Sequence, residues 1–301
     1  MSIKLLVAAL LPAVALCIYV FKKDRVEKEP IGLLLLLFGL GALSCLPIYY
    51  VERFFHWLLD VIFAPLGEAD ANGNVMLSSG VFYLYHFLKY FIGVALVEEG
   101  FKFLFLVLAT KKNKNFNCLF DGMIYAIFVS LGFAALENIK YVANYGFIVA
   151  IRRAVLSVPT HMFCAVLMGY YYSLWHIGDQ VVRMERDLKA RNIIRAKTPE
   201  VEVRGSIVLC LLIPTLAHGF YDFCCTLNSD LANFAFYAFV IFLYIHCFKK
   251  IRQFSVTDGY TGDYANGLLV RKYPELFVVR QENEPEQAEC AESQSLDSAV
   301  D

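Results

Sequence analysis

The sequence predicts an all-α integral membrane protein that crosses the bilayer about seven times. Of its 301 residues, 58% are hydrophobic and 15% are aromatic, and its mean hydropathy of +0.54 is far above that of an ordinary soluble domain. Apolar runs of about 20 residues, the length of a membrane-spanning helix, recur between short polar stretches. We therefore expect a polytopic helical bundle that lies mostly in lipid.

Seven apolar runs are the predicted transmembrane helices, at residues 3–21, 32–50, 79–109, 118–144, 149–176, 205–226 and 231–248. The first is interpreted as a retained helix, because basic residues follow it and no small-residue cleavage site precedes Lys22. The third is about 30 residues long, so it must be tilted, kinked near Gly93 or Gly100, or extended beyond the lipid.

The chain divides by composition into a membrane domain and a tail. Residues 1–250 are the predicted transmembrane helical domain, and residues 251–301 are a largely polar, cytoplasmic C-terminal tail. After Val279 the tail becomes acidic and cannot bury enough apolar area to fold. We expect its end to be disordered.

The distribution of lysine and arginine predicts the orientation in a cell membrane. Basic segments at 22–28, 111–114, 183–197 and 249–252 lie in alternate connections of the seven-span arrangement, so all four face one side. The positive-inside rule assigns that side to the cytoplasm, with the N-terminus outside and the C-terminus inside. Arg53, Arg152 and Arg153 lie on the opposite side, against this bias.

Several function classes lack the residues they need. The nine cysteines include no CxxC pair, so neither a zinc ribbon nor a disulfide framework is indicated. The chain has no nucleotide-binding glycine loop and no basic-aromatic patch, and no nucleic-acid partner is expected. The partner that composition indicates is the lipid bilayer.

Ionisable side chains occur at membrane depth in four predicted helices. Each charge near the bilayer centre costs roughly 3 kcal/mol on insertion scales, so each needs a reason. The groups are Glu98, Glu99 and Lys102 in the third run, Glu137 in the fourth, His161 in the fifth, and His218 with Asp222 in the sixth. If the four helices converge, these groups share one water-accessible cavity.

Helical spacing groups some of these residues. Glu98 and Lys102 are four residues apart and lie on one face, as do His218 and Asp222. Glu98 and Glu99 point about 100° apart, so Lys102 is expected to neutralise only one of them well. The other then needs a proton, a metal or a second partner.

Structural roles compete with functional ones for each group alone. A Glu–Lys pair at this spacing is more often a structural ion pair, and a lone buried histidine is more often a packing residue. Seven such groups on four helices favour a functional site. No site role is predicted for the histidines near helix ends or without an acidic partner, which are His56, His86, His176 and His246.

Two hydrolytic schemes fit these groups. His161 and His218 with a carboxylate such as Glu137 can bind a divalent metal, most plausibly zinc, while another glutamate acts as general base. Without a metal, a glutamate in low-dielectric surroundings can activate water, and a histidine or Asn138 stabilises the oxyanion. In both schemes Asp222 orients the imidazole one turn away.

The motifs also carry a family resemblance. Over roughly residues 80–225 the chain resembles the PrsW family of intramembrane proteases, which is distantly similar to the CAAX prenyl endopeptidases and Abi-type proteins. The matching motifs, in the order of that family, are EExxK at Glu98–Lys102, FxxxE at Phe133–Glu137 followed by Asn138, the His161 motif, and HxxxD at His218–Asp222.

The resemblance implies cleavage of a membrane-anchored protein, an anti-sigma factor cut on its extracytoplasmic side during envelope stress signalling. It also implies that Glu98, Glu99 and His161 are essential. The second motif ends in glutamate where the CAAX relatives have histidine, so the metal scheme and the glutamate–water scheme both stay open.

An intramembrane endopeptidase, with metalloprotease as its favoured subtype, is the leading hypothesis. Two other classes are kept open. One is a proton-coupled carrier that uses the buried groups as a relay, against which the lack of an inverted repeat counts. The other is a zinc-dependent membrane lipid hydrolase.

Overall fold

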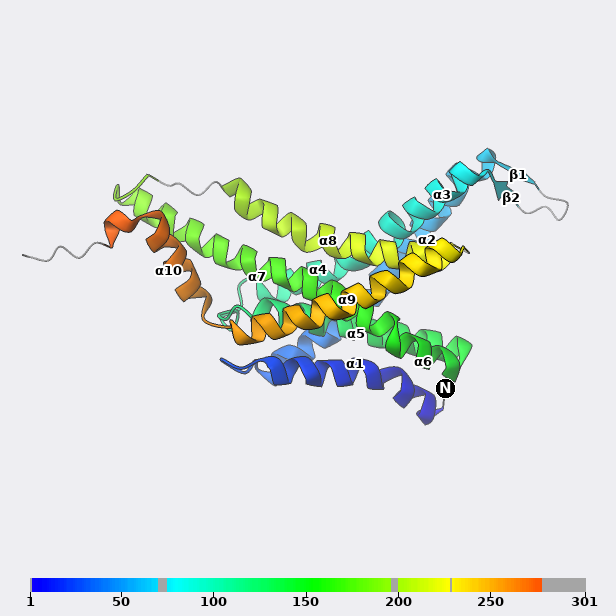
Figure 1. The fold of residues 1–301 in the computed structure, drawn as a ribbon, viewed down its shortest axis with the longest axis horizontal. Coiled ribbons are helices and arrows are strands. Elements are labelled where there is room, and N and C mark those ends of the chain that lie inside the picture. Colours follow the sequence, from blue (N-terminus) through cyan, green and yellow to red (C-terminus); the bar gives the residue numbers. More distant parts are fainter. Residues whose placement is uncertain (1, 70–74, 196–199, 228, 278–301) are drawn as a thin grey trace, which may run out of the picture.

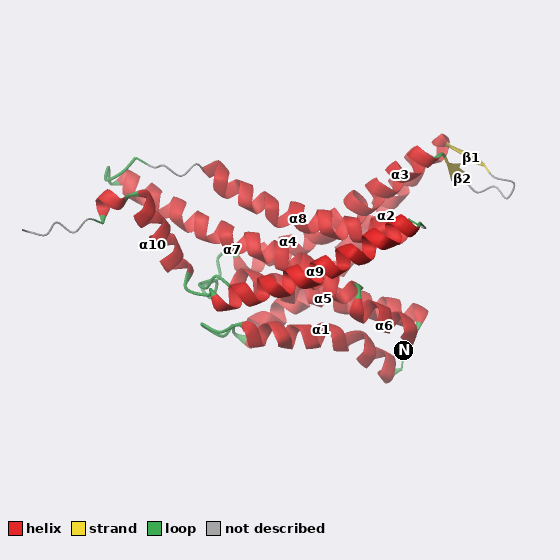
Figure 2. Cartoon of the chain, viewed as in Figure 1, coloured by secondary structure: helices red, strands yellow, loops and turns green. Residues whose placement is uncertain are grey.

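The computed structural model describes residues 2–69, 75–195, 200–227 and 229–277, and these residues are almost entirely helical, as predicted (Figures 1 and 2). The α-helices are α1 (Ile3–Lys23), α2 (Ile31–Phe63), α3 (Ser79–Phe87), α4 (Val97–Thr110), α5 (Asp121–Tyr145), α6 (Phe147–Val155), α7 (Ser157–Ala190), α8 (Glu200–Thr226), α9 (Asp230–Val256) and α10 (Thr261–Lys272). The remaining elements are 3-10 turns at Ala64–Leu66 and Pro274–Leu276, a π-helix at Leu88–Leu96, and the hairpin strands β1 (Gly67–Ala69) and β2 (Val75–Leu77).

Among the described residues, six helices are long and apolar enough to cross a membrane, namely Ile3–Lys23, Ile31–Leu66, Asp121–Tyr145, Phe147–Ala190, Ser206–Thr226 and Asp230–Val256. The predicted span at residues 79–109 is instead three successive elements, α3, the π-helix and α4, of 9, 9 and 14 residues. The π-helix interrupts the regular α-helix of this run, and it contains Gly93, one of the two glycines near which a kink is predicted.

Helix α5 forms the centre of the bundle. Every residue from Asp121 to Ala135 is buried, and the helix packs against α1, α2 and α7. This burial on all sides explains why its sequence is apolar all round. The second half of α5 carries Glu137, which is therefore held by the most enclosed helix of the fold.

Helices α2 and α5 touch through their backbones. A Cβ atom added to Gly41 of α2 would lie 1.8 Å from the carbonyl oxygen of Val129, and one added to Gly132 of α5 would lie 1.9 Å from the carbonyl oxygen of Phe38. Small residues permit this close approach of membrane helices. The contact fixes α5 against α2.

Three connections meet at the end of the bundle that carries α10, opposite the N-terminus (Figure 1). The Asp258 carboxylate accepts a hydrogen bond from the backbone N–H of Phe120 at 2.9 Å, and Glu29 accepts one from the Tyr125 hydroxyl at 2.7 Å. Burial raises the pKa of Glu29 to about 7 and also raises the pKa values of Asp24 and Asp258. Buried acidic groups thus join the α1–α2, α4–α5 and α9–α10 connections.

The chain after residue 250 begins in helix. α9 continues to Val256, and α10 packs against α7. The expected disorder concerns the acidic end of the tail, and residues 278–301 lie outside the described residues.

Candidate active site

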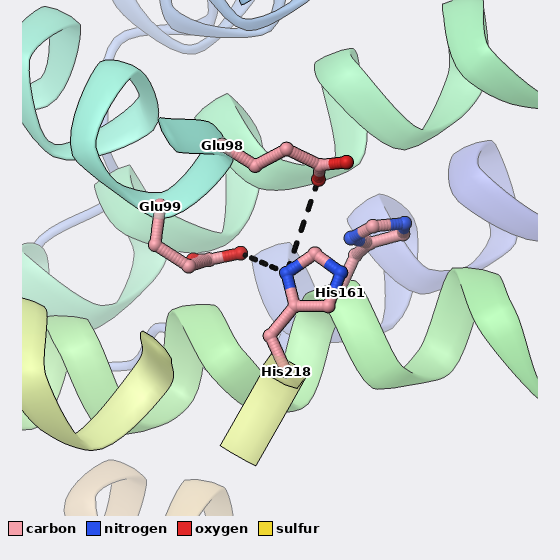
Figure 3. Close-up of side chains that lie close together, drawn as sticks. All are labelled: Glu98, Glu99, His161 and His218. Carbon is pink, nitrogen blue, oxygen red and sulfur yellow. Dashed lines mark hydrogen bonds and ion pairs between the residues drawn. The ribbon is translucent and has the colours of Figure 1, made fainter. Parts of the chain in front are cut away.

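Helices α4, α5, α7 and α8 bring the predicted ionisable groups to one place. The side chains of Glu98 and Glu99 from α4 point toward the imidazole of His218 from α8, with the ring of His161 from α7 beside it (Figure 3). The ring centroids of His161 and His218 are 5.2 Å apart, with the rings nearly perpendicular. All four side chains are buried.

Lys102 pairs with both neighbouring glutamates. Its Nζ atom lies 3.0 Å from Glu98 Oε2 and 2.9 Å from Glu99 Oε1, so the expectation that it neutralises only one of them well is wrong. The i+3 and i+4 spacings place both carboxylates over the same lysine, which reaches between them. The ammonium is also 3.3 Å from His161 Nδ1 and lies over the ring of Phe133.

His218 contacts a carboxylate through each ring nitrogen. Its Nδ1 atom is 2.9 Å from Glu99 Oε1, and its Nε2 atom is 3.4 Å from Asp222 Oδ2. Glu98 Oε2 is further away, at 3.9 Å from Nδ1. Glu99 therefore has the second partner that the sequence analysis expected for one of the two glutamates, and Asp222 lies where it can fix the orientation of the ring.

His161 is held by a chain of polar contacts that ends on α6. Its Nε2 atom is 2.9 Å from Glu137 Oε2, and the same carboxylate oxygen accepts a hydrogen bond from Arg153 Nη2 at 2.6 Å. Arg153 also donates from Nε to Asn138 Oδ1 at 3.0 Å. In the sequence, Arg153 stood out only as a basic residue on the outer side, against the positive-inside bias. The structure places it among the residues of the site.

Asn138 is engaged away from the reacting groups. Its Nδ2 atom donates to the carbonyl oxygen of Ala9 at 2.7 Å, its Oδ1 accepts from Arg153, and the residue is fully buried outside the cavity wall. This position makes Asn138 a support for Arg153 and a tie to α1. It does not favour the predicted alternative of an oxyanion donor.

A cavity of about 710 Å³ opens beside these groups. Residues of α2, the π-helix, α4, α5, α6, α7 and α8 contribute to its wall, which is more elements than the four predicted. Glu98, Glu137, His161, His218 and Asp222 line it, whereas Glu99 and Lys102 lie behind the wall. Glu98 is therefore the α4 carboxylate that faces the cavity.

Two further cavity residues were not predicted. Glu52 and His56 lie on α2, and both line the cavity. Glu52 Oε1 and His56 Nε2 are buried and have no hydrogen-bond partner among the described residues. Glu52 was not recognised because the second span was predicted to end at residue 50, whereas α2 continues to Phe63. His56 was predicted to have no site role because it carries no acidic partner at helical spacing.

The π-helix that precedes Glu98 ends at Leu96. π-helical segments widen a helix locally and are frequent at functional sites. Here the widened turns lie directly before the two glutamates and contribute Lys89, Tyr90 and Val94 to the cavity wall. No residue pattern in this apolar run marks the π geometry.

Four residues are placed so that they can share a metal ion. Glu98, Glu99, His161 and His218 each offer one ligand atom, and these atoms lie within 4.8 Å of one another. Imidazole nitrogens with carboxylate oxygens are a donor set of catalytic zinc sites, so the residue types fit such a metal. Glu99 Oε2 is buried without a hydrogen-bond partner in the described structure. Glu137, the predicted third ligand, is not in this group.

Comparisons with known proteins add independent information. The model of a family described as PrsW family intramembrane metalloprotease matches residues 29–247. The protease PrsW of Oceanobacillus iheyensis is 31% identical over 221 residues, which are 73% of this chain and 82% of the relative. Those of Clostridioides difficile and Bacillus subtilis are 30% and 27% identical and cover 84% and 82% of this chain, and 92% and 93% of the relatives. No solved structure matches the chain.

Proposed function

The chain belongs to the PrsW family of intramembrane proteases, and we propose that it hydrolyses a peptide bond of a membrane-anchored protein beside Glu98. The observation that carries this proposal is the cavity of about 710 Å³ whose wall contains Glu98, Glu137, His161, His218 and Asp222. A cavity with convergent polar groups at membrane depth is the expected setting for hydrolysis inside a membrane.

Glu98 is the proposed general base. Its carboxylate faces the cavity and is within reach of a water there, whereas Glu99 is fully buried behind it. Glu98 takes a proton from the water, the hydroxide oxygen attacks the substrate carbonyl carbon, and the proton passes to the leaving amine. Lys102 balances the charge of both glutamates and holds Glu98 in place.

The two histidines are proposed to position the charged groups of the site. His161 and His218 both line the cavity, and the Nε2 atom of each ring contacts a carboxylate, which is Glu137 for His161 and Asp222 for His218. Such carboxylates fix the ring orientation. Both imidazoles are thereby held in fixed orientations at the wall of the cavity that also contains Glu98.

We further propose that the enzyme is a metalloprotease, with Glu99, His161 and His218 of this group as the residues that would hold the ion, which leaves Glu98 to act as general base. The description of the matching family supports this subtype. A bound divalent metal, zinc by donor type, would supply a Lewis acid and an activated water. Lys102 contacts Glu98, Glu99 and His161, so its ammonium and a metal would compete for the same ligand atoms.

The proposed substrate is an anti-sigma-factor-like protein with one membrane span, cut on the extracytoplasmic side in a stress response. The family resemblance supports this choice. The basic segments support an orientation with the N-terminus outside and the C-terminus in the cytoplasm. The cavity then lies toward the outer half of the membrane.

A cleavage assay tests the protease. The full chain is co-expressed with a tagged, single-span anti-sigma factor, and the shortened product is followed by immunoblot. Wild type should produce it, and Glu98→Gln and His161→Ala should not, at equal amounts of folded protein. The matched control is His246→Ala, since His246 stacks on Phe242 of α9 outside the cavity. Cleavage by all variants would overturn the proposed site.

Elemental analysis tests the metal. Purified wild type, His161→Ala and His218→Ala are dialysed against a weak chelator before measurement. One zinc per chain in the wild type, lost in both variants, is the expected result. A wild type that cleaves without any metal would replace the proposed metal scheme with the glutamate–water scheme.

A further inference from the structure

We infer that the cavity selects substrates with acidic side chains close to the scissile bond, and that Lys89, Lys140 and Arg152 recognise them. These three residues are called the cationic rim below. The inference rests on the proposed protease function and names its substrate class. It concerns residues that neither the family motifs nor the hydrolytic chemistry uses.

The cationic rim belongs to the same cavity as the reacting groups. Lys89 comes from the π-helix, Lys140 from α5 and Arg152 from α6, and all three line the wall that contains Glu98 and His161. The consecutive helices α5 and α6, and the π-helix much earlier in the chain, thus each place one cation in the wall.

The rim has no acidic partner among the residues that the structure describes. Glu98, Glu137 and Asp222, which share the cavity wall, are already paired with Lys102, Arg153 and His218, and Glu52 forms no ion pair there with a rim residue. Lys89 instead lies over the rings of Tyr85 and Tyr90, and Lys140 lies over Tyr49. The positive charges are therefore available to a ligand.

Cations without an acidic partner are costly at a cavity wall near lipid, so the cationic rim calls for a functional explanation. The wall also contains four carboxylates, and the three rim cations are those that these carboxylates leave without an ion pair, so they can attract an anionic ligand. In the predicted orientation they also lie on the outer side, which the positive-inside rule leaves poor in lysine and arginine. An acidic substrate segment would supply the missing counter-charge and offset the cost of placing these cations near lipid.

Helix geometry gives the distance over which the rim can act. Lys140 is three residues after Glu137 on α5, which corresponds to about 4.5 Å along the α-helix axis. An extended peptide covers about 3.3 Å per residue, so Lys140 reaches substrate side chains about one to two residues from the peptide group beside Glu137. Aspartate or glutamate within that distance is the expected recognition feature.

A binding assay tests the rim. Full-length protein carrying His161→Ala, so that peptides stay intact, is placed in phosphatidylcholine nanodiscs. Fluorescent single-span peptides carry four Asp, four Ser or four Lys next to the membrane segment, and binding is followed by anisotropy. The Asp peptide should bind at least tenfold more tightly than the Lys peptide. Adding Lys89→Glu, Lys140→Glu and Arg152→Glu should reverse that order.

The control carries the same change in net charge away from the cavity, with Lys22→Glu, Lys112→Glu and Lys114→Glu, all at exposed positions. It should keep the preference for the Asp peptide. Equal binding of the three peptides, or a preference that survives reversal of the rim, would overturn the inference. So would loss of the preference when phosphatidylglycerol is added, because the rim would then bind lipid headgroups. Since the assay measures binding, a wild type that cleaves nothing is a separate result, which counts against the proposed function.

Discussion

Arg153 and His161 contact the same carboxylate oxygen of the membrane-embedded Glu137, from α6 and α7 respectively. Arg153 donates to this oxygen at 2.6 Å, and the imidazole nitrogen lies 2.9 Å from it. The short helix α6 is thereby connected to a residue of the proposed catalytic site. The position of α6 therefore affects the orientation of the His161 imidazole through Glu137.

Arg153→Gln is expected to lower the cleavage rate by about 10- to 100-fold, the usual effect of removing a group that orients an active-site histidine. The pH–rate profile should also change, because Glu137 would lose its guanidinium partner. Arg153→Lys should recover some of the rate, since it keeps the charge. The control is Arg183→Gln, which removes an exposed ion pair with Asp179 on α7. Unchanged rate and pH profile in Arg153→Gln would contradict this role.

Lys102→Met should destabilise the protein strongly, because it leaves the Glu98 and Glu99 carboxylates buried without their cation. Removing one member of a buried ion pair costs about 3–5 kcal/mol. Thermal unfolding in detergent measures the loss, with the exposed Lys112→Met as the control. The double variant Glu99→Gln/Lys102→Met should be more stable than Lys102→Met. An unfolding temperature equal to that of the wild type would show that Lys102 is not needed to balance these charges.

Glu29 is expected to make stability fall with rising pH. Its pKa in the folded protein is raised from an ordinary 4.5 to about 7, so the folded state keeps the proton while the unfolded state loses it. Stability from this group is present below about pH 4.5 and is lost between there and about pH 7. Glu29→Gln should therefore be more stable than wild type at pH 8, with a smaller difference at pH 5.

The measurement is the unfolding temperature across this pH range. Glu68→Gln, at an exposed position in β1, should leave the pH dependence unchanged. A Glu29→Gln protein that loses stability with pH as steeply as wild type would show that other groups control the effect.

Gly41→Ala is expected to push α2 and α5 apart, because the new methyl group would meet the carbonyl of Val129. Overpacking of this kind costs about 1–3 kcal/mol. Gly39→Ala is a matched control on the same helix, since no heavy atom lies within 4 Å of its added Cβ. Unfolding temperatures of the two variants in detergent provide the measurement. Equal values would mean that the helices can separate without cost.

The sequence predicted the helical bundle and the convergence of four helices because both follow from local patterns. Apolar runs of membrane length mark spans, and ionisable groups within them mark the site. The role of Arg153 was not recognised because it depends on an ion pair with Glu137, which only tertiary packing brings near. Glu52 was missed because α2 extends beyond its most apolar stretch. The pairing of Lys102 with both glutamates depends on a side-chain conformation that spacing alone does not determine.

The contact between Gly41 and Val129, and its counterpart between Gly132 and Phe38, also bears on how a substrate arrives. A membrane segment that diffuses sideways from the lipid would have to separate backbones that are already in contact. The seam between α2 and α5 is therefore closed to lateral passage, and a substrate would have to approach the proposed catalytic groups through a different gap between helices. The docking route is thus restricted by glycine positions that are not involved in the chemistry.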